Sequence, residues 1–438
     1  MIDRPASWIA EAAGARLAAG EPTAPGPERA LIDSREAGPG DLFVGLRGEQ
    51  VDGGEFAATA LEHGAWGALV GRPHAGLETD RPLLVTDDPL AALQRLARAW
   101  RRELGCKVIG ITGSTGKTST KDILAAVLRP QLRTHANREN LNTEIGLPLS
   151  VLEAPPEAEV LVLEMAMRGE GQIAELAAIA EPDVGVIVNV GPVHLELLGT
   201  VERVAAAKAE LIRDLPAGAA CVVPASEPLL DAHLRDDLDT WTFGPGGQTM
   251  LLSFENGLAE IEARGEGHTL ELGYSEPHNL LNTLAAVAAA RAIGAWPAGA
   301  VDVEFSSMRG QLVELPGGVA VVNDCYNANP MSMRAALEHL ADSPAERRIA
   351  VLGTMAELGP DAPRYHREIG DVADRLGIDV LVTVGEHALA YAEGFAGETH
   401  AVASPEEAAA LLEELAMPGD RVLVKGSRSV GLERVLAV

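Results

Sequence analysis

Short apolar runs alternate with longer, mixed segments along most of this 438-residue chain. The short runs are rich in Val, Leu and Ile, which is typical of strands that are buried on both faces. The segments between them carry apolar residues at helical spacing and predict helices. Because strands that alternate with helices form parallel, doubly wound sheets, we predict an α/β protein. At about 150 residues per domain, the length fits about two to four domains.

Three blocks follow from this pattern. Residues 1–84 predict a small α/β domain, residues 85–306 a central domain with a parallel sheet, and residues 307–438 a second parallel, Rossmann-like domain. The strands expected in the three blocks are 41–46, 66–70 and 82–85; 107–112, 160–164 and 184–190; and 319–323, 348–352, 379–384 and 421–424. The helices expected are 56–63, 90–104, 119–129, 172–180 and 277–294, with antiparallel strands over 251–272.

The segment VIGITGSTGKTSTK, residues 108–121, is typical of a strand, a phosphate-binding loop and a helix. Backbone N–H groups at a helix start bind anions, Lys117 reaches the terminal phosphates, and the Thr118 hydroxyl is suited to Mg²⁺. The strict P-loop pattern requires glycine at position 111, where this chain has Ile111. A glycine-rich turn without a ligand is the alternative. The order of strand, Gly-Lys-Thr and helix favours a nucleoside triphosphate.

Composition narrows the class of protein. The formal charge is −29, and a basic face is what nucleic-acid binding needs, so we expect no nucleic acid partner. The three cysteines are far apart and fit neither a disulfide framework nor a zinc site. The first residues lack the basic start and apolar core of a secretory signal, and no stretch is apolar enough to insert into a membrane. We expect a cytoplasmic protein.

Two of three further candidate residues lie where a parallel sheet presents its ligand-binding edge. Glu164 ends the run VLVLE and His194 follows the run that begins at Val184, while Lys208 lies in a predicted helix. A carboxylate beside a phosphate loop often contacts Mg²⁺. A solvated carboxylate, a capping histidine and an ordinary helix lysine would give the same pattern, so the spacing alone leaves both readings open.

Five segments in this order resemble the Mur ligase family, the ATP-dependent amide-forming enzymes of peptidoglycan precursor synthesis: TGSTGKTS, LVLEMAM, NVGPVHLE, AAAKAEL and EPHNLLNTLAA. The resemblance covers nearly the whole chain and all three blocks, and the family's phosphate loop has the same glycine spacing. It implies that a substrate carboxylate attacks the γ-phosphate of ATP, and that an amine then attacks the resulting acyl phosphate.

Three segments most resemble the family members that add D-alanyl-D-alanine to UDP-N-acetylmuramoyl-tripeptide. They are residues 140–148, 323–330 and 351–359, the last followed by His366. These two substrates are therefore the expected partners, and a monomer is expected. Another Mur ligase or a folylpolyglutamate synthetase is the nearest alternative. A P-loop ATPase that makes no amide is the alternative from a different class.

The resemblance also implies site residues. Lys117, Lys208, His194 and Glu164 are implied to act in catalysis, with Lys208 carbamylated by CO₂. Two Mg²⁺ ions would be held by Thr118, Glu164, His194 and Lys208. ATP would contact Gly113, Ser114, Thr115, Gly116, Lys117, Thr118, Ser119, Asn279, Asn282, Arg309, Asp324, Tyr326 and Asn327. The UDP-sugar peptide would contact Asp33, Ser34, Arg35, Gly45, Arg47, Asn140 and Asn142. Gly54, Thr143 and Thr354 depart from the family pattern, which weakens the prediction of substrate contacts more than that of ATP.

Overall fold

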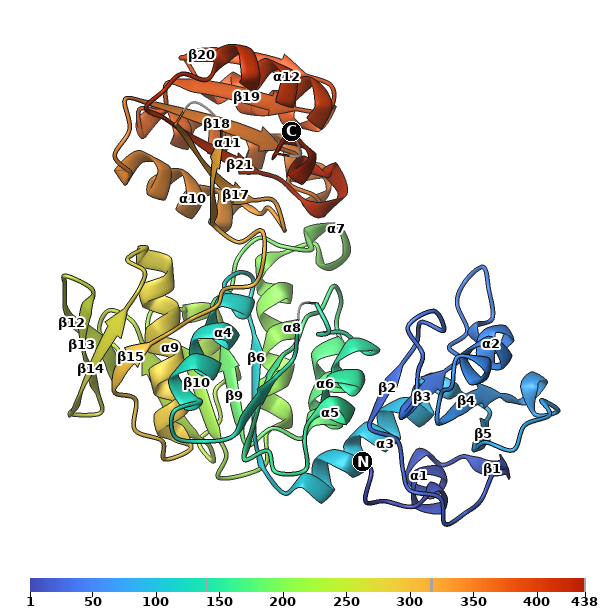
Figure 1. Cartoon of the computed structure of the whole chain (residues 1–438). Helices are drawn as coiled ribbons and strands as arrows, with labels where there is room; N and C mark the ends of the chain where they lie inside the picture. The colour runs from blue at the N-terminus through green and yellow to red at the C-terminus, as the bar shows by residue number, and fades with distance from the viewer. Residues whose placement is uncertain (139, 316–317, 437–438) are drawn as a thin grey trace.

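The computed structural model describes residues 1–138, 140–315 and 318–436, and these form three α/β units, each built on its own sheet. Figure 1 shows the N-terminal unit, in blue, beside the central unit, and the C-terminal unit, in orange and red, above it. The predicted fold class is confirmed.

The N-terminal unit contains five strands in the order β1-β5-β4-β3-β2. β2 to β5 are parallel, whereas β1 pairs antiparallel with β5. The elements are α1 (Ala6–Ala13), β1 (Arg16–Ala19), β2 (Arg29–Leu31), β3 (Asp41–Val44), α2 (Ala57–Glu62), β4 (Gly67–Gly71) and β5 (Leu83–Thr86). The predicted helix and three strands are present here. α1, β1 and β2 are additional elements that the apolar pattern did not indicate.

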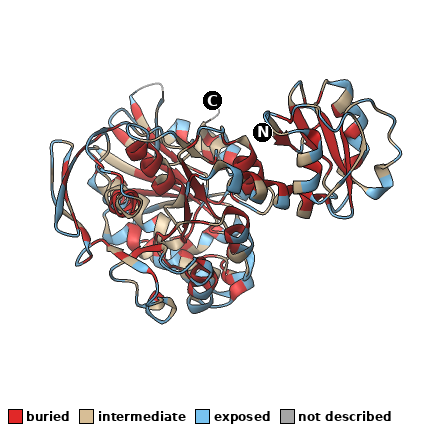
Figure 2. Cartoon of the chain, turned by 90° about the horizontal axis from the view of Figure 1, so that it is seen from below, coloured by how far each residue is buried: buried red, intermediate tan, exposed pale blue. Residues whose placement is uncertain are grey.

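The long helix α3 (Pro89–Leu104) joins the first unit to the second. It begins where the Asp88 carboxylate accepts the Ala91 N–H, and it packs against α1 on one side and α5 (Gly146–Glu153) and α6 (Gln172–Ala180) on the other. Its buried residues belong to one continuous apolar core that extends into all three units. Figure 2 shows this buried side of α3, in red, between the two units.

The central unit has ten strands in the order β15-β14-β13-β12-β11-β10-β9-β6-β8-β7. The run from β12 to β7 is parallel, and β12, β13 and β14 form the expected antiparallel meander. The strands are β6 (Lys107–Thr112), β7 (Thr134–Ala136), β8 (Val160–Glu164), β9 (Val184–Ile187), β10 (Ala220–Pro224), β11 (Asp239–Phe243), β12 (Thr249–Glu255), β13 (Leu258–Ala263), β14 (Glu266–Leu272) and β15 (Gly299–Val301). The helices besides α5 and α6 are α4 (Lys117–Leu128), α7 (Leu195–Leu198), α8 (Val201–Asp214) and α9 (Pro277–Ala292).

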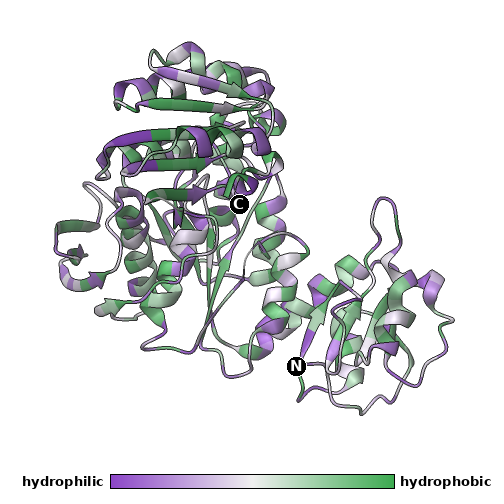
Figure 3. Cartoon of the chain, turned by 45° about the horizontal axis from the view of Figure 1, so that its top comes forward, coloured by the Kyte–Doolittle hydropathy of each residue, from purple (hydrophilic) through white to green (hydrophobic). Residues whose placement is uncertain are grey.

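The C-terminal unit has six strands in the order β16-β17-β21-β18-β19-β20. Five are parallel, but the edge strand β16 is antiparallel to β17, because the two are consecutive and form a hairpin. The elements are β16 (Gln311–Leu315), β17 (Val319–Asp324), α10 (Pro330–Asp342), β18 (Arg347–Gly353), the short helix η4 (Gly359–Asp361), α11 (Ala362–Arg375), β19 (Val380–Val384), β20 (Glu398–Val402), α12 (Pro405–Leu415) and β21 (Asp420–Lys425). Figure 3 shows the apolar strands, in green, enclosed by helices of mixed hydropathy.

This arrangement positions the candidate site. β6, β8 and β9 are parallel neighbours, so their carboxyl ends meet at one edge of the central sheet, and the C-terminal unit packs over that edge through α7 and η4. None of the helices in the described ranges has both the length and the apolar character that crossing a bilayer requires.

Candidate active site

The phosphate loop lies between β6 and α4, as predicted. Its fold is fixed from outside: the Asn189 side-chain oxygen accepts the N–H groups of Ser114 and Thr115 at 3.1 and 3.0 Å. Gly116 has a φ of +77°, which favours glycine. The first backbone bond of α4 runs from Thr120 N–H to Gly116 O at 2.8 Å, so the N–H groups just before Thr120 have no partner within the helix. The loop therefore presents free donors at the positive end of a helix, as an anion site requires.

Glu164 lies directly beside this loop. Its Oε2 accepts the Thr118 hydroxyl at 2.7 Å, and its Oε1 accepts the Asn142 amide at 2.8 Å. The Glu164 backbone is held as well, because its N–H donates to Asn137 Oδ1 at 2.8 Å. The carboxylate is almost fully buried. The structure thus brings together Thr118 and Glu164, both predicted to hold Mg²⁺, and it adds Asn142, which the sequence placed on the peptide substrate.

Two lysines lie near the same point, Lys208 buried and Lys117 half-buried. Lys117 Nζ donates to Gly113 O at 2.9 Å, and burial lowers the pKa of its ammonium, with the nearby Glu164 carboxylate opposing that shift. Burial lowers the pKa of Lys208 more strongly, and the charge of Lys117 acts in the same direction. Among the described residues, no carboxylate offsets the shift at Lys208. A buried lysine without an acidic partner favours the uncharged, nucleophilic amine.

His194 lies in the loop that follows β9, in a left-handed conformation with φ of +54°. Its loop touches the phosphate loop, since Gly191 and Ser114 exchange two hydrogen bonds of 2.9 and 3.1 Å. Its Nδ1 contacts the carboxylate of Glu357 in the C-terminal unit. His194 therefore lies at the predicted edge of the sheet, although the partner that the structure gives it is a residue of another unit.

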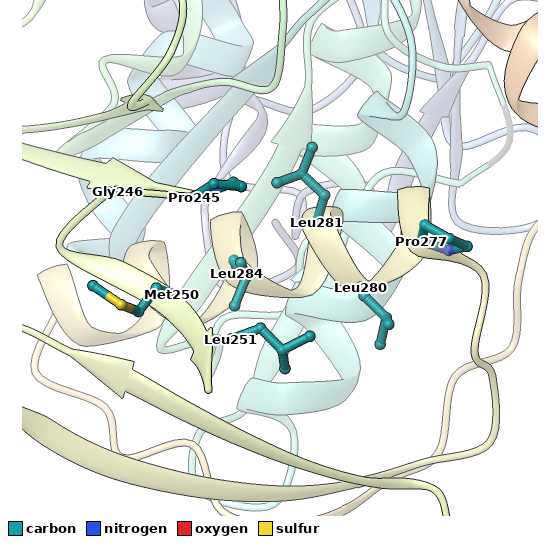
Figure 4. Close-up of a pocket in the computed structure, with 8 residues that line it drawn as sticks. All are labelled: Pro245, Gly246, Met250, Leu251, Pro277, Leu280, Leu281 and Leu284. Carbon is teal, nitrogen blue, oxygen red and sulfur yellow. The ribbon is translucent and has the colours of Figure 1, made fainter. Parts of the chain in front are cut away.

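Asn279 and Asn282 lie at the start of α9, on the far side of the phosphate loop. The Asn282 amide is packed against Gly116, where an added Cβ would lie 2.7 Å from Asn282 Oδ1. The first turns of α9 also line an apolar cavity of about 320 Å³, shown in Figure 4. Its lining residues are Pro245, Gly246, Met250, Leu251, Pro277, Leu280, Leu281 and Leu284. Neither asparagine lines this cavity, so the predicted adenine-side residues face a different region.

The C-terminal unit brings Arg309 to the phosphate loop. Its guanidinium lies 4.0 Å from the ring centre of Tyr326, and its positive charge contributes to the lowered pKa of Lys117. The buried Arg309 Nε has no hydrogen-bond partner in the parts of the chain that the structure describes. An unpaired guanidinium group beside a phosphate loop is suited to an anionic ligand.

Asp324 and Asn327 lie next to Lys425, whose Nζ donates to Asp324 Oδ2 at 2.5 Å and to the Asn327 carbonyl at 2.9 Å. The charges of Glu276 and Asp324 oppose the lowering of the pKa of His278, at the start of α9, that burial causes. The predicted third-domain residues thus form two contacts, Arg309 with Tyr326 and Lys425 with Asp324 and Asn327.

The predicted substrate residues of the N-terminal unit are less closely gathered. Asp33 and Arg35 form an ion pair with each other at 2.5 Å, and the Ser34 carbonyl bonds the His63 ring at 3.0 Å. Gly45 lies against Gly54, since a Cβ at Gly45 would lie 2.7 Å from Gly54 Cα. The backbones of Arg47 and Asp52 form an isolated antiparallel β-bridge. Asn140 lies in the loop before α5, where its carbonyl accepts the Asn142 N–H at 2.8 Å. Their roles stay predictions.

Gly54, which departs from the family pattern, has a clear structural consequence. A Cβ at this position would lie 2.3 Å from Cδ2 of His74, so the His74 ring occupies the space that a side chain at 54 would take. Gly54, Glu55, Ala58, Pro73, His74, Gly76 and Leu77 line a cavity of about 380 Å³.

Sequence reasoning missed several residues that hold the site. Asn137 and Asn189 fix Glu164 and the phosphate loop, Lys425 holds Asp324, and Glu357 pairs with His194. The signal for Lys425 was present, because the chain contains only five lysines and two of the others, Lys117 and Lys208, are predicted site residues. Glu357 lies in the segment 351–359 that carries the family resemblance, but nothing local indicated its contact with His194, and nothing local to position 137 indicated a role for Asn137.

A phosphate loop at the edge of a parallel sheet, with the charge of an arginine from a second α/β unit acting on its lysine, defines a nucleotide-binding protein whose site lies between domains. Three family models agree with this and with the order of the units: the Mur ligase family catalytic domain at residues 30–101, the Mur ligase middle domain at 111–290 and the Mur ligase glutamate ligase domain at 308–428. The chain belongs to the Mur ligase family, and it is an ATP-dependent ligase.

Individual relatives are similar over almost the whole chain. The UDP-N-acetylmuramoyl-tripeptide–D-alanyl-D-alanine ligase of Synechocystis is 37% identical, covering 92% of this chain and 90% of the relative. The crystal structure of MurF from Acinetobacter baumannii superposes with a TM-score of 0.88 at 29% identity, covering 100% of this chain and 99% of that one. MurF from Thermotoga maritima, solved in complex with ADP, gives a TM-score of 0.79 at 33% identity, covering 93% and 96%. The predicted family and three-domain fold are confirmed.

Proposed function

We propose that this enzyme joins D-alanyl-D-alanine to UDP-N-acetylmuramoyl-tripeptide, with ATP converted to ADP and phosphate. The observation that carries the proposal is the likeness, over nine-tenths of the chain, to a relative named for this reaction. The site supports it, because Lys117 begins α4, Glu164 bonds Thr118 in the same turn, and the charge of Arg309 acts on Lys117.

The chain's own residues have defined tasks in this reaction. Lys117 and the N–H groups at the start of α4 hold the ATP phosphates, and Arg309 adds positive charge from the C-terminal unit. The tripeptide carboxylate attacks the γ-phosphorus, which breaks the bond to the ADP oxygen and forms an acyl phosphate. The amine of the dipeptide then attacks the acyl carbon, and phosphate leaves as the amide forms. The C-terminal unit covers the edge of the sheet, where it would shield the acyl phosphate from water.

Mg²⁺ fits the donors that are present. Thr118 and Glu164 supply hard oxygen ligands beside the phosphate loop, already oriented by a mutual hydrogen bond of 2.7 Å and by Asn142. When bound there, Mg²⁺ would neutralise the charge of the phosphates and of the attacking carboxylate. We propose that Thr118 and Glu164 hold one ion, and that Glu164, His194 and Lys208 hold a second.

Lys208 fits the carbamate that the resemblance implies. A neutral Lys208 amine adds to CO₂ through its lone pair and loses one proton, which gives an anionic carbamate with two oxygen ligands. Burial and the charge of Lys117 keep the amine uncharged, which this addition requires. Once formed, the anionic carbamate would be attracted to the Lys117 ammonium.

The test is phosphate release from Mg-ATP with UDP-N-acetylmuramoyl-tripeptide, with and without D-alanyl-D-alanine, combined with mass analysis of the product. We expect release that needs both substrates and a UDP-pentapeptide product. Release without the dipeptide, or with a different amine, would assign the chain to another reaction of the family. Phosphate release that needs neither the dipeptide nor the nucleotide sugar would show an ATPase without ligase activity.

A further inference from the structure

One carboxylate of the C-terminal unit contacts two loops of the central unit. Glu357, in the loop after β18, bonds His194 Nδ1 through Oε2, and Arg168 Nε lies 3.5 Å from its Oε1. His194 follows β9 and Arg168 follows β8, so both loops belong to the edge that carries the phosphate loop. We propose that Glu357 is a positioning residue that fixes the ring of His194 with the proton on Nδ1 and the Nε2 lone pair free for the reaction centre. The role in the reaction rests on the proposed function.

The backbone at this contact is unusual on both sides. His194 has φ of +54° and Glu357 has φ of +63°, which lie in the left-handed backbone region that residues other than glycine rarely occupy. Such conformations persist only where the surroundings enforce them, and they concentrate at functional sites.

The neighbours of Glu357 show how it is enforced. The Met355 N–H donates to Nε2 of the buried His366 at 2.9 Å, and the Ala356 N–H donates to the Ser427 hydroxyl at 2.9 Å. The side chains of Met355 and Leu358 are buried in the core. The loop is therefore fixed on both sides of Glu357, so the carboxylate is held ready before any ligand binds.

The same residue makes a backbone contact between the units. The Glu357 carbonyl accepts the Glu196 N–H at 3.1 Å, and Gly359 packs so closely on Glu196 that an added Cβ would lie 3.3 Å from its Cα. The His194 contact thus exists only while the C-terminal unit is docked. Docking of this unit and orientation of the ring are one event.

The chemistry follows from the donor and acceptor roles. An ionised carboxylate only accepts hydrogen bonds, so the proton must be on Nδ1 of His194. In a neutral ring this leaves Nε2 with the lone pair that a metal ligand or proton acceptor needs. The loop that carries His194 is also held to the phosphate loop, through the hydrogen bonds between Gly191 and Ser114. The His194 ring is therefore fixed relative to both units.

The test is the ring tautomer of His194, measured by ¹⁵N NMR on ¹⁵N-histidine-labelled full-length protein without ligands. The chain has 11 histidines, and the His194 signals are assigned by their loss in His194→Gln. We expect the Nδ1–H tautomer in the native chain and a mixture with the Nε2–H form in Glu357→Ala. Glu357→Gln retains an oxygen acceptor and should retain the Nδ1–H form. Glu413→Ala, an exposed carboxylate on α12, is the matched control.

Steady-state kinetics on the same variants provide the second measurement. Glu357→Ala should lower kcat by about 10- to 100-fold, as loss of a partner of a ligating histidine does, while the KM for ATP stays close to native. Glu357→Gln should recover most of kcat. Thermal unfolding separates this from a stability effect.

The outcomes are distinct. An unchanged tautomer in Glu357→Ala, or an Nε2–H ring in the native chain, would overturn the positioning role. A tautomer that changes as expected, in a native protein that makes no amide, would overturn the proposed function and leave the positioning of His194 supported.

Discussion

Alanine substitutions at Gly116 and Gly171 can separate two effects of a side chain in the phosphate loop: collision with its neighbours and strain of the backbone. Both are the residue just before a helix of the central unit, α4 and α6, with φ of +77° and +84°. A Cβ in this left-handed region costs about 1 to 2 kcal/mol. Alanine at either position should therefore lower the free energy of unfolding of the central unit by about that amount.

The two sites differ in their surroundings. A Cβ at Gly116 would lie 2.7 Å from Asn282 Oδ1 and 3.3 Å from Val188 Cγ1. At Gly171, no atom of the described residues lies within 4 Å of an added Cβ. Gly116→Ala must therefore also displace the Asn282 amide or shift the loop. We expect its affinity for ATP to fall at least tenfold, which is about 1.4 kcal/mol of binding free energy. Gly171→Ala should bind ATP like the native chain.

The assay combines urea unfolding of both variants with calorimetric titration of Mg-ATP. Native affinity in Gly116→Ala would refute the steric argument, and weakened binding in both variants would show that strain alone disturbs the site. Native stability in Gly171→Ala would refute the estimate of the strain.

Three further predictions follow from the site and its surroundings. Lys117→Ala should abolish ATP turnover with little change in folding, because it removes the ammonium that faces the phosphates; near-native phosphate release would contradict the phosphate-loop assignment. Lys208→Ala should lose most activity and regain part of it with added short carboxylates such as acetate or propionate, which would replace the carbamate; full activity without them would make Lys208 a structural residue. The hydrogen bonds from Arg102, followed by those from Arg98, lower the pKa of Glu181 from 4.5 to about 2. Since a lowered carboxylate pKa adds stability above the unfolded value, Glu181→Gln should lose about 0.5 to 1 kcal/mol at pH 7, a small figure because the pair is largely exposed. That difference from the native chain should vanish as the pH falls from 4.5 to 2 in urea unfolding, and a difference that persists at pH 2 would show that charge is not its cause.

The sequence predicted best the strands that are buried on both faces. Strands β6 and β8 begin and end at the predicted residues, because each contains four consecutive apolar residues, 108–111 and 160–163, that the sheet buries. Helix α5 was missed for a related reason: its segment GLPLSVLE is buried along seven of eight residues and has no amphipathic period. The edge strands β1 and β16 lack a long apolar run in the sequence. Their antiparallel direction is set by the neighbouring strands β5 and β17 with which they pair.

The contacts of the site likewise fall into those that local sequence patterns predict and those that they do not. Thr118 and Glu164 could be placed together because Glu164 ends β8 and Thr118 lies just beyond the end of the neighbouring parallel strand β6. The Thr118 hydroxyl is 2.7 Å from Glu164 Oε2. The contact between His194 and Glu357 could not be predicted, since it joins residues 163 positions apart on different units. Contacts of that kind depend on how rigid units dock, and no local pattern encodes docking.

The charges at the site indicate why the units meet there. The charge of Arg309 acts on Lys117, and Glu164 is the carboxylate that opposes it there. Gathering buried cations costs free energy unless an anion joins them. A triphosphate supplies that anion, so part of its binding energy would relieve repulsion that the folded chain already contains. By mass action, a ligand that binds only the folded and docked form stabilises it, about 2.7 kcal/mol at one hundred times its Kd. Binding of ATP and docking of the C-terminal unit should therefore reinforce each other, with Arg309 as the link between them.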